Sequence, residues 1–389
     1  MQTMVRWTAV LFIFFFSFSA YSADKASSRL ISVEHTIHEL QSVQLNEQRR
    51  VLVRVPSSYS QSNERYPVVY LLDGDEPYIT QVAGIIDTLA ATGNTPEMIV
   101  ISIPNIDRRR DFTPTPSPKW PKTGGAEKFL NFIEKELIPY IDSNYRTEPY
   151  RIFVGHSLGG LLVIHSYLTR PKMFNAYIAA SPVLQWDNLY PVRQAEQLLP
   201  KHPTLPLRTL YSALGDEPPY LEAFNAFQEV LKKTAPQNLD YEFQQFKNEN
   251  HGTITTPTFH LGLKKIWSHW KAPKNSSLDA LEKHYAAASL KYGFNIKVPL
   301  YAINELGYHL LQTTQLSDAI NALKRAIELY PDSPRTLFAY GNLANAFEKN
   351  KELEQARKSY ETGLQLAIKT NNSQMQQFFQ EEIKRLSNL

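Results

Sequence analysis

Few short patterns restrict a fold as strongly as a β-rich run that passes through a glycine-flanked serine into a helix-compatible run. Residues 151–160 read RIFVGHSLGG, and residues 158–169 continue as an apolar stretch compatible with a helix. A serine in G-x-S-x-G between a strand and a helix sits on a tight turn that lifts its hydroxyl clear of the sheet. Glycines on both sides relieve the crowding of that turn. The pattern predicts Ser157 as a nucleophile.

The chain around this serine alternates β-rich runs with amphipathic or alanine-rich runs, as strands joined by crossover helices in a mostly parallel sheet do. Together with the serine turn, this predicts an α/β-hydrolase fold, a mostly parallel central sheet flanked by helices. The segment 30–41, where polar and apolar residues alternate, is expected to be an antiparallel edge strand. We expect the other strands at 50–55, 68–72, 98–103, 151–154, 176–180, 208–213 and 241–246, and helices at 78–91, 126–144, 158–169, 220–233 and 258–270.

A serine nucleophile needs a base, and in this fold the chain order is nucleophile, acid, histidine. That order selects His251, which lies in a polar loop just after the last expected strand. The acid should follow the preceding strand, where Asp216 and Glu217 are adjacent. Glu217 is favoured and Asp216 is the alternative, with Glu222 or a serine–histidine pair without an acid as further options. The acid would hold the imidazole tautomer and stabilise its charged form.

An oxyanion hole needs two preorganised backbone donors, one of them from the residue after the nucleophile. That residue is Leu158. The other donor should come from the loop after the third strand, which reads LLDGD at 71–75. We expect the N–H of Asp75 in this role, with Gly74 as the alternative. The HGGG element of many lipases is missing from the sequence.

The first two dozen residues are typical of an export signal. A basic residue precedes an apolar run from Trp7 to about Phe18, and small residues follow the run. The apolar run is shorter than the roughly 20 residues that span a bilayer. We therefore expect residues 1–23 to be a signal peptide and the mature chain to start between Tyr21 and Asp24. Secretion to the periplasm, without stable membrane insertion, is the expected outcome.

Composition narrows the class of protein further. The 41 basic and 38 acidic residues give a net charge of +3, a balance too even for the one-sided field of a nucleic-acid binder. Cysteine is absent, which excludes disulfides, thiolate metal sites and cysteine nucleophiles. The histidines are scattered rather than paired on one helix face. No metal or organic cofactor is expected.

Beyond residue 270 the pattern changes. A short polar linker at 271–276 follows the expected hydrolase domain of residues 24–270, and residues 277–389 contain no β-rich run. Within this segment, Leu306 and Ala319 recur as Leu343 and Ala356, at an offset of 37 residues (343 − 306 and 356 − 319). The offset resembles the tetratricopeptide unit of about 34 residues, and residues 333–340 are expected to lengthen a helix of the second unit. We expect a helical cap on the hydrolase domain, with a groove for a protein partner as the alternative.

Several motifs together resemble the esterase family of α/β hydrolases that contains S-formylglutathione hydrolase, feruloyl esterase modules and enterobactin-type siderophore esterases. The motifs are LDG at 72–74, RRDFTP at 109–114, GGA at 124–126, ELIP at 136–139, GHSLGG at 155–160, ASP at 180–182 and HG at 251–252. They are most similar to the siderophore esterase branch. The resemblance implies cleavage of the lactone esters of catecholate siderophores through an acyl-enzyme.

The segment 107–119, expected to be a loop, concentrates three arginines ahead of a proline-rich stretch. Arg109 and Arg110 are candidates for binding an anionic substrate such as a ferric tris-catecholate, because guanidinium groups pair with such charge. The alternative is that Arg110 pairs with a carboxylate and pins the segment. Trp186 is a candidate for stacking on an aromatic ring of the substrate, or a core residue.

The sequence thus predicts a serine carboxylic ester hydrolase that acts through an acyl-enzyme on a small-molecule ester, with siderophore-type lactones as one substrate class. A general acyl or carbohydrate esterase, acting on acetyl or feruloyl groups, is the alternative within enzymes. A repeat-containing interaction protein with a weakly active hydrolase platform is the alternative from another class.

Overall fold

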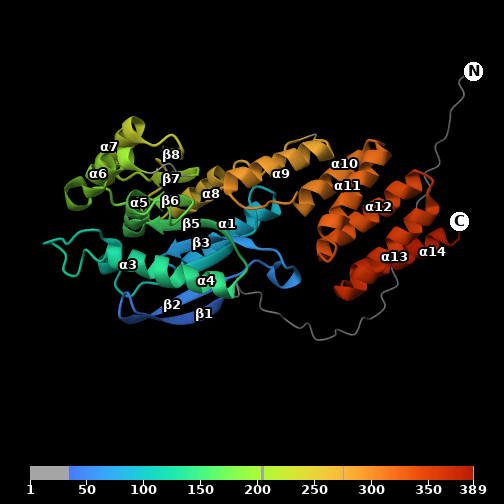
Figure 1. Ribbon diagram of the computed structural model, residues 1–389, viewed down its shortest axis with the longest axis horizontal. Coiled ribbons are helices and arrows are strands. Elements are labelled where there is room, and N and C mark those ends of the chain that lie inside the picture. The colour runs from blue at the N-terminus through green and yellow to red at the C-terminus, as the bar shows by residue number, and fades with distance from the viewer. Residues whose placement is uncertain (1–34, 203–205, 275, 389) are drawn as a thin grey trace, which may run out of the picture. The chain divides into compact units, whose positions relative to one another are not determined.

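An eight-stranded sheet forms the centre of the first two thirds of the chain (Figure 1). The computed structural model describes residues 35–202, 206–274 and 276–388, so the expected signal peptide at 1–23 lies outside the described residues. The strand order is β1-β2-β4-β3-β5-β6-β7-β8. Strand β2 is antiparallel to β1 and β4, and all other neighbours are parallel. The strands are β1 (Thr36–Ser42), β2 (Glu47–Arg54), β3 (Tyr66–Leu72), β4 (Ile99–Ile103), β5 (Thr147–His156), β6 (Ala176–Ala180), β7 (Arg208–Leu214) and β8 (Leu239–Gln245).

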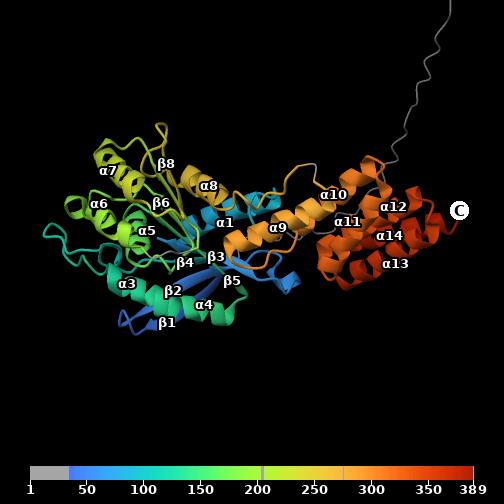
Figure 2. The same cartoon turned by 45° about the horizontal axis from the view of Figure 1, so that its top comes forward.

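The sheet is covered on both faces (Figure 2). Every residue of β3 (YPVVYLL) and of β6 (AYIAA) is buried, as near-continuous apolar runs are in a parallel sheet with two covered faces. Helices α1 (Glu76–Ala91) and α8 (Thr255–Ile266) share the core of one face. The other core is built with α3 (Ala126–Phe132), α4 (Ile138–Asn144), α5 (Leu158–Thr169), α6 (Trp186–Leu198) and α7 (Pro218–Thr234). The predicted α/β-hydrolase fold is confirmed.

The structure differs from the local expectations at three places. The segment 107–119 is not a continuous loop, because α2 (Arg108–Phe112) forms where the Asp107 side chain accepts a hydrogen bond from the Arg110 N–H at 3.1 Å. Helix α6 was not expected at all. Its first turn contains three residues with positive φ, 187–189, and Pro191 lies inside it. The expected single helix at 126–144 contains a π-helical turn, Ile133–Leu137, between α3 and α4.

The described residues after 276 are helical. The helices are α9 (Leu278–Tyr292), α10 (Leu300–Gln312), α11 (Leu316–Leu329), α12 (Leu337–Lys349), α13 (Leu353–Lys369) and α14 (Ser373–Leu386). The pair α12–α13 begins 37 residues after the pair α10–α11 (337 − 300 and 353 − 316). Within residues 333–340, which were expected to lengthen a helix, a 3₁₀ turn at Pro334–Thr336 runs directly into α12. The first residue of this turn is a proline, which suits a helix start.

An aromatic cluster joins the helical segment to the sheet. Trp267, which is 1% exposed, lies with its ring centroid 4.9 Å from that of Tyr150 and 4.6 Å from that of Tyr292 in α9. The Tyr292 hydroxyl donates to the Ile266 carbonyl oxygen at 3.1 Å. One buried core therefore runs from the sheet face through α9 into α10 and α11.

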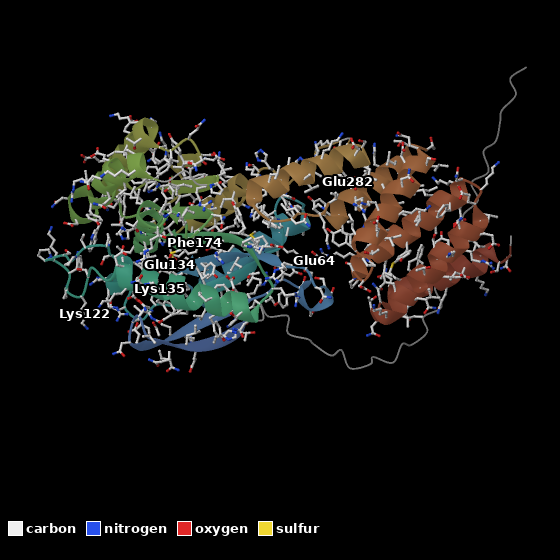
Figure 3. All side chains as sticks on the ribbon, in the orientation of Figure 1. Glu64, Lys122, Glu134, Lys135, Phe174 and Glu282 are labelled. Carbon is white, nitrogen blue, oxygen red and sulfur yellow. The ribbon has the colours of Figure 1, made fainter. Side chains whose placement is uncertain are left out.

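The helical segment is attached near the amino ends of the strands. The residues of the hydrolase domain that contact the helical segment lie just before β3 or β4 in the sequence. The carboxyl ends of β3, β5 and β7, by contrast, lead into the serine turn and its neighbouring loops. Glu64, one of the contacting residues, is labelled in Figure 3. The polar contacts are Tyr301 Oη to the Gly93 carbonyl at 3.1 Å, Lys297 to Glu64 at 3.0 Å and Arg335 to Glu97 at 3.4 Å.

Truncating Trp267 to alanine should cost about 3–5 kcal/mol of unfolding free energy, because it leaves a cavity between the sheet and α9. Urea unfolding followed by circular dichroism measures the loss. Leu290→Ala on α9 is the matched control, since Leu290 is 87% exposed and its truncation should change little. Equal effects of the two substitutions would contradict the joint role assigned to this cluster.

No helix among the described residues has both the length and the apolar character needed to cross a bilayer.

Candidate active site

Ser157 lies on the turn between β5 and α5, as its pattern predicts. Its backbone has φ 59° and ψ −117°, a conformation that non-glycine residues rarely adopt. A Cβ on Gly155 would come within 2.5 Å of the Gly159 backbone, so the chain can fold back this tightly only with glycine there. The Ser157 N–H donates to the Ala180 carbonyl at 2.9 Å, and its own carbonyl accepts from Val183 at 3.3 Å. The strained turn is thus held by β6 and by the segment that follows it.

Glu217 and His251 form a hydrogen-bonded pair. Glu217 Oε2 contacts His251 Nδ1, and the carboxylate is buried, at 7% exposure. Asp216, by contrast, is exposed. The other Glu217 oxygen accepts from Ser181 Oγ and, at 3.2 Å, from the Gly215 N–H. These donors satisfy the buried carboxylate and fix its orientation.

The imidazole of His251 is packed between two rings. Its centroid lies 4.6 Å from that of His156 and 5.3 Å from that of Tyr220. His156 is the residue before Ser157, so the imidazole stands beside the serine turn. Glu217 engages Nδ1 of His251, which leaves Nε2 as the nitrogen that would act on Ser157. Catalytic contacts of this kind often tighten only when substrate is bound.

The two candidates for the second oxyanion donor differ in their surroundings. The Gly74 N–H donates to the Ile103 carbonyl at 3.2 Å and extends the parallel ladder. The Asp75 N–H donates to the Asp73 carbonyl two residues earlier, at 2.8 Å, in a tight turn. Leu158 is the first residue of α5, where the N–H has no partner within the helix. Asp75 is exposed and Gly74 is buried, and both remain candidates for the second donor.

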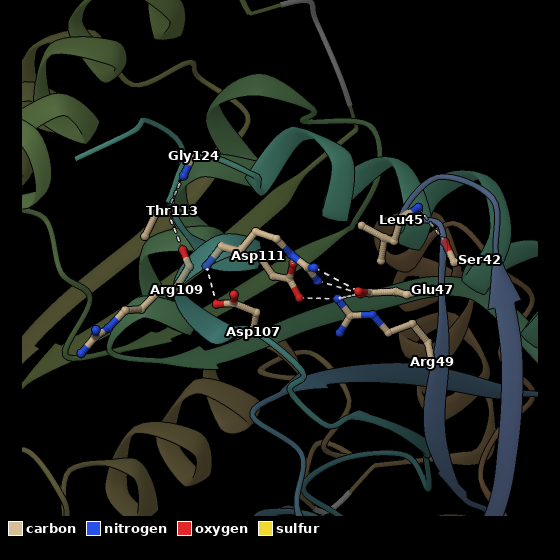
Figure 4. A network of polar contacts seen from close by, with 10 residues as sticks. Ser42, Leu45, Glu47, Arg49, Asp107, Arg109, Asp111, Thr113 and Gly124 are labelled. Atoms are coloured by element: carbon tan, nitrogen blue, oxygen red, sulfur yellow. Dashed lines mark hydrogen bonds and ion pairs between the residues drawn. The ribbon is translucent and has the colours of Figure 1, made fainter. Parts of the chain in front are cut away.

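An ion-pair network holds α2 against β2 (Figure 4). Arg110 donates to both Glu47 oxygens, at 2.6 and 3.0 Å, and to Asp111 at 2.7 Å. Asp111 also pairs with Arg49, and both side chains are 1% exposed. Arg110 lowers the pKa of Glu47, mainly through this hydrogen bond. Of the two roles considered for Arg110, these contacts favour pinning the segment over binding a substrate.

Arg109 and Trp186 are in different settings. Arg109 is exposed, and its guanidinium lies 4.2 Å from the centroid of the Trp120 ring. The Trp186 indole N–H donates to Thr115 Oγ1 at 3.0 Å. Trp186 lies three residues after Val183, whose N–H donates a hydrogen bond to the Ser157 carbonyl. Both side chains remain candidates for substrate contact.

Comparison with known proteins gives the family. The family model described as "Putative esterase" matches residues 42–251, which is more than half of the chain. This protein belongs to that esterase family. It is a hydrolase of the α/β type.

Named relatives of this esterase are siderophore esterases. The ferri-bacillibactin esterase BesA of Bacillus subtilis is 33% identical over 219 residues, 49% of this chain and 74% of BesA. The apo-salmochelin esterase of Escherichia coli is 25% identical, over 65% of this chain and 80% of its own length. A crystal structure of an IroE-like serine hydrolase from Shewanella oneidensis aligns with a TM-score of 0.68 at 26% identity, covering 76% of this chain and 100% of the other.

Two polar groups of this esterase's site escaped the sequence reasoning. Ser181 has a positive φ of 39° and donates to Glu217, the candidate acid. It lies in the ASP motif at 180–182, which could have drawn attention to it. Arg108 donates to both carboxylate oxygens of Asp73. Nothing in the local sequence singles it out from the two arginines beside it.

Acid should destabilise the folded esterase partly through His156. Burial, and then the neighbouring His251, lowers the pKa of His156 from 6.5 to about 4. As the pH falls, His156 therefore binds a proton at a higher pH in the unfolded chain than in the folded protein. His156 contributes to the free energy of unfolding fully above pH 6.5, and this contribution is lost as the pH falls toward 4. The loss over that range is about 3 kcal/mol. Urea unfolding at pH 7.5 and 4.5 should show a smaller acid loss for His156→Phe than for the wild type. An equal loss would contradict the shift.

Proposed function

We propose that this protein is a serine esterase that hydrolyses siderophore-type lactone esters through an acyl-enzyme, with Ser157, His251 and Glu217 as its catalytic triad. The observation that carries the proposal is the hydrogen bond between the buried Glu217 carboxylate and His251, whose ring packs against the residue before the strained Ser157 turn. A serine, a histidine and a carboxylate that lie far apart in the sequence thus lie in one region of the fold, which supports their assignment to a triad.

In the proposed reaction His251 takes the proton of Ser157 as the hydroxyl attacks the ester carbonyl. The N–H groups of Leu158 and Asp75 stabilise the tetrahedral oxyanion. Collapse expels the alcohol, which receives the proton from His251, and leaves an acyl group on Ser157. Water, activated by the same histidine, then releases the acid. Glu217 holds the imidazole tautomer throughout.

Two observations support the substrate class. The relatives BesA and apo-salmochelin esterase are named for siderophores, and the chain covers 74% and 80% of their lengths. Arg109 is exposed, and its guanidinium packs against the Trp120 ring, so an anionic group could approach it from solvent. A catecholate siderophore offers such charge beside its ester bonds.

The test is hydrolysis of a cyclic catecholate trilactone, in its iron-free and ferric forms, followed by chromatography of the linear products. The wild type should open the lactone and Ser157→Ala should not. An intact ferric siderophore should also compete with an aryl ester. Turnover of the aryl ester without lactone cleavage or competition would reject the siderophore class and favour a general acyl or carbohydrate esterase. No turnover of any ester would reject the enzyme and favour an interaction protein.

We further propose that the chain is exported to the periplasm and that the catalytic domain spans residues 24–270, with tetratricopeptide-like helices at 277–389. The sequence supports export through the apolar run at 7–18. The regular offset between helix pairs supports the repeats. N-terminal sequencing of the protein recovered from a periplasmic extract tests the first proposal. A retained Met1 would contradict it.

A further inference from the structure

We propose that the cavity between the hydrolase domain and the helical segment is a binding site for an aromatic α-amino acid, held by Arg65 and Glu148. One side of the cavity is formed by residues before β3 and β4 and at the start of β5, and the other by α10 and the turns before α10 and α12. Because these are the amino ends of the strands, the site lies away from Ser157. The inference therefore does not rest on the proposed esterase function.

The size and position of this cavity suit a small ligand. Its volume is about 900 Å³. Ligand pockets typically measure about 300–1,000 Å³ and occur preferentially where two domains meet.

The charges that line the cavity are balanced, but not all of them are paired. Its lining contains four carboxylates and four cationic side chains. Three of each form ion pairs: Glu64 with Lys297 at 3.0 Å, Glu97 with Arg335 at 3.4 Å and Asp332 with Lys369 at 2.7 Å. Arg65 and Glu148 are left over, and within the described part of the chain neither has an ion-pair partner. This arrangement suits a ligand that carries one charge of each sign.

Arg65 and Glu148 are neighbours that do not neutralise each other. Arg65 Nε donates to the Thr147 carbonyl at 2.9 Å, which holds the guanidinium one residue from Glu148. Arg65 is exposed and Glu148 is half-buried. Burial raises the pKa of Glu148, Arg65 lowers it in part, and Glu64 raises it further. A cationic group beside the Glu148 carboxylate would relieve the cost of burying its charge.

Two half-buried aromatic rings line the same cavity. The Phe294 ring centroid lies 6.3 Å from that of Tyr150, which follows Glu148 by two residues on β5. Trp270 packs edge-on against Trp267 at 5.8 Å, and Phe294 lies 6.5 Å from the same Trp267 ring. Phe294 and Trp270 thus offer apolar ring surface near the unpaired charges, and such surface favours an aromatic ligand.

An aromatic α-amino acid matches these features together. Its carboxylate can accept from the N–H groups of Arg65 that the Thr147 carbonyl does not use. Its ammonium group can pair with Glu148, and its side chain can pack against Phe294 and Trp270. An amine or a carboxylic acid alone would leave either Arg65 or Glu148 without a partner.

The experiment is isothermal titration calorimetry of the wild type with L-phenylalanine, which should bind with a Kd below about 1 mM. Two analogues each lack one charge: 3-phenylpropionate has no ammonium group, and 2-phenylethylamine has no carboxylate. Each analogue should bind at least roughly 10-fold more weakly than the amino acid, because each loses a hydrogen bond between charged groups.

Two substitutions assign the charges to their residues. Glu148→Gln should weaken L-phenylalanine binding by at least roughly 10-fold and leave 3-phenylpropionate binding unchanged. Arg65→Gln should weaken L-phenylalanine binding by a similar factor and leave 2-phenylethylamine binding unchanged. Glu196→Gln, which neutralises an exposed carboxylate on α6, is the matched control and should bind L-phenylalanine like the wild type.

Three outcomes would overturn the inference. They are a wild type that does not bind L-phenylalanine, analogues that bind as tightly as the amino acid, and binding that both substitutions leave unchanged. Circular dichroism checks that the variants keep the fold. If one of them does not fold, the comparison of the three ligands on the wild type still decides whether the site requires both charges.

Discussion

Ser157→Ala is expected to abolish ester turnover, lowering kcat by roughly four to six orders of magnitude. Alanine removes the attacking oxygen, and no other described hydroxyl shares the turn between β5 and α5 with the neighbouring His251. The fold should be unaffected, because the hydrogen bonds that hold the turn come from the backbone of Ser157. Stopped-flow kinetics with an aryl ester measure the effect. The wild type should show a burst of phenolate equal to the enzyme concentration and the variant none.

The matched control is Ser143→Ala, which removes an exposed hydroxyl near the end of α4. It should leave both the burst and the steady rate unchanged. A fluorophosphonate probe should label the wild type and this control at one residue, Ser157, found by peptide mass spectrometry. Labelling of another serine, or turnover by Ser157→Ala above a thousandth of the wild-type rate, would contradict the assignment of the nucleophile.

Glu217→Gln should lower kcat by roughly 10⁴-fold at neutral pH. The amide has the same shape as the carboxylate, but its NH₂ group donates where the His251 Nδ1–H needs an acceptor. The imidazole would then present the wrong tautomer to Ser157. Its protonated form would also no longer be stabilised by the negative charge of the carboxylate. KM should change little, because Glu217 is buried behind the histidine rather than facing the substrate.

Asp216→Asn is the matched control for this substitution. Asp216 is the adjacent carboxylate, but it is exposed and Glu217 is the carboxylate that bonds to the imidazole, so the loss of Asp216 should change kcat less than about threefold. If Asp216→Asn lowers kcat more than Glu217→Gln, the acid is misassigned. If neither substitution matters, the reaction runs on a serine–histidine pair.

The sequence predicted the parts of the site that depend on local chain geometry. The turn at Ser157 needs glycines at fixed offsets, so it leaves a readable pattern, and α5 begins and ends where that pattern indicates. Chain order then led to His251 and to the Glu217–Asp216 pair. The choice between the two carboxylates was not readable. It depends on which way the loop after β7 turns, and there the Asp216 N–H bonds to the Glu249 carbonyl.

What escaped prediction depends on contacts between distant segments. Arg108 is separated from Asp73 by 35 residues and from His156 by 48, and the three adjacent arginines look alike in sequence. Only the position of α2 on β2 gives each one its own partner. Helix α6 was missed because Pro191 and the irregular first turn hide its periodicity. The attachment of α9 through Trp267 likewise has no local signature.

The place where the helical segment is attached has a practical consequence. Its described polar contacts reach residues before β3 and β4, so the loops that carry Ser157, Glu217 and His251 lie at the opposite ends of the strands. Immobilising the protein through α13 or α14, on a bead or a sensor surface, would therefore leave the route of substrate diffusion to Ser157 unobstructed. The C-terminal helices provide a natural handle for tethering the catalyst without steric occlusion of its active site.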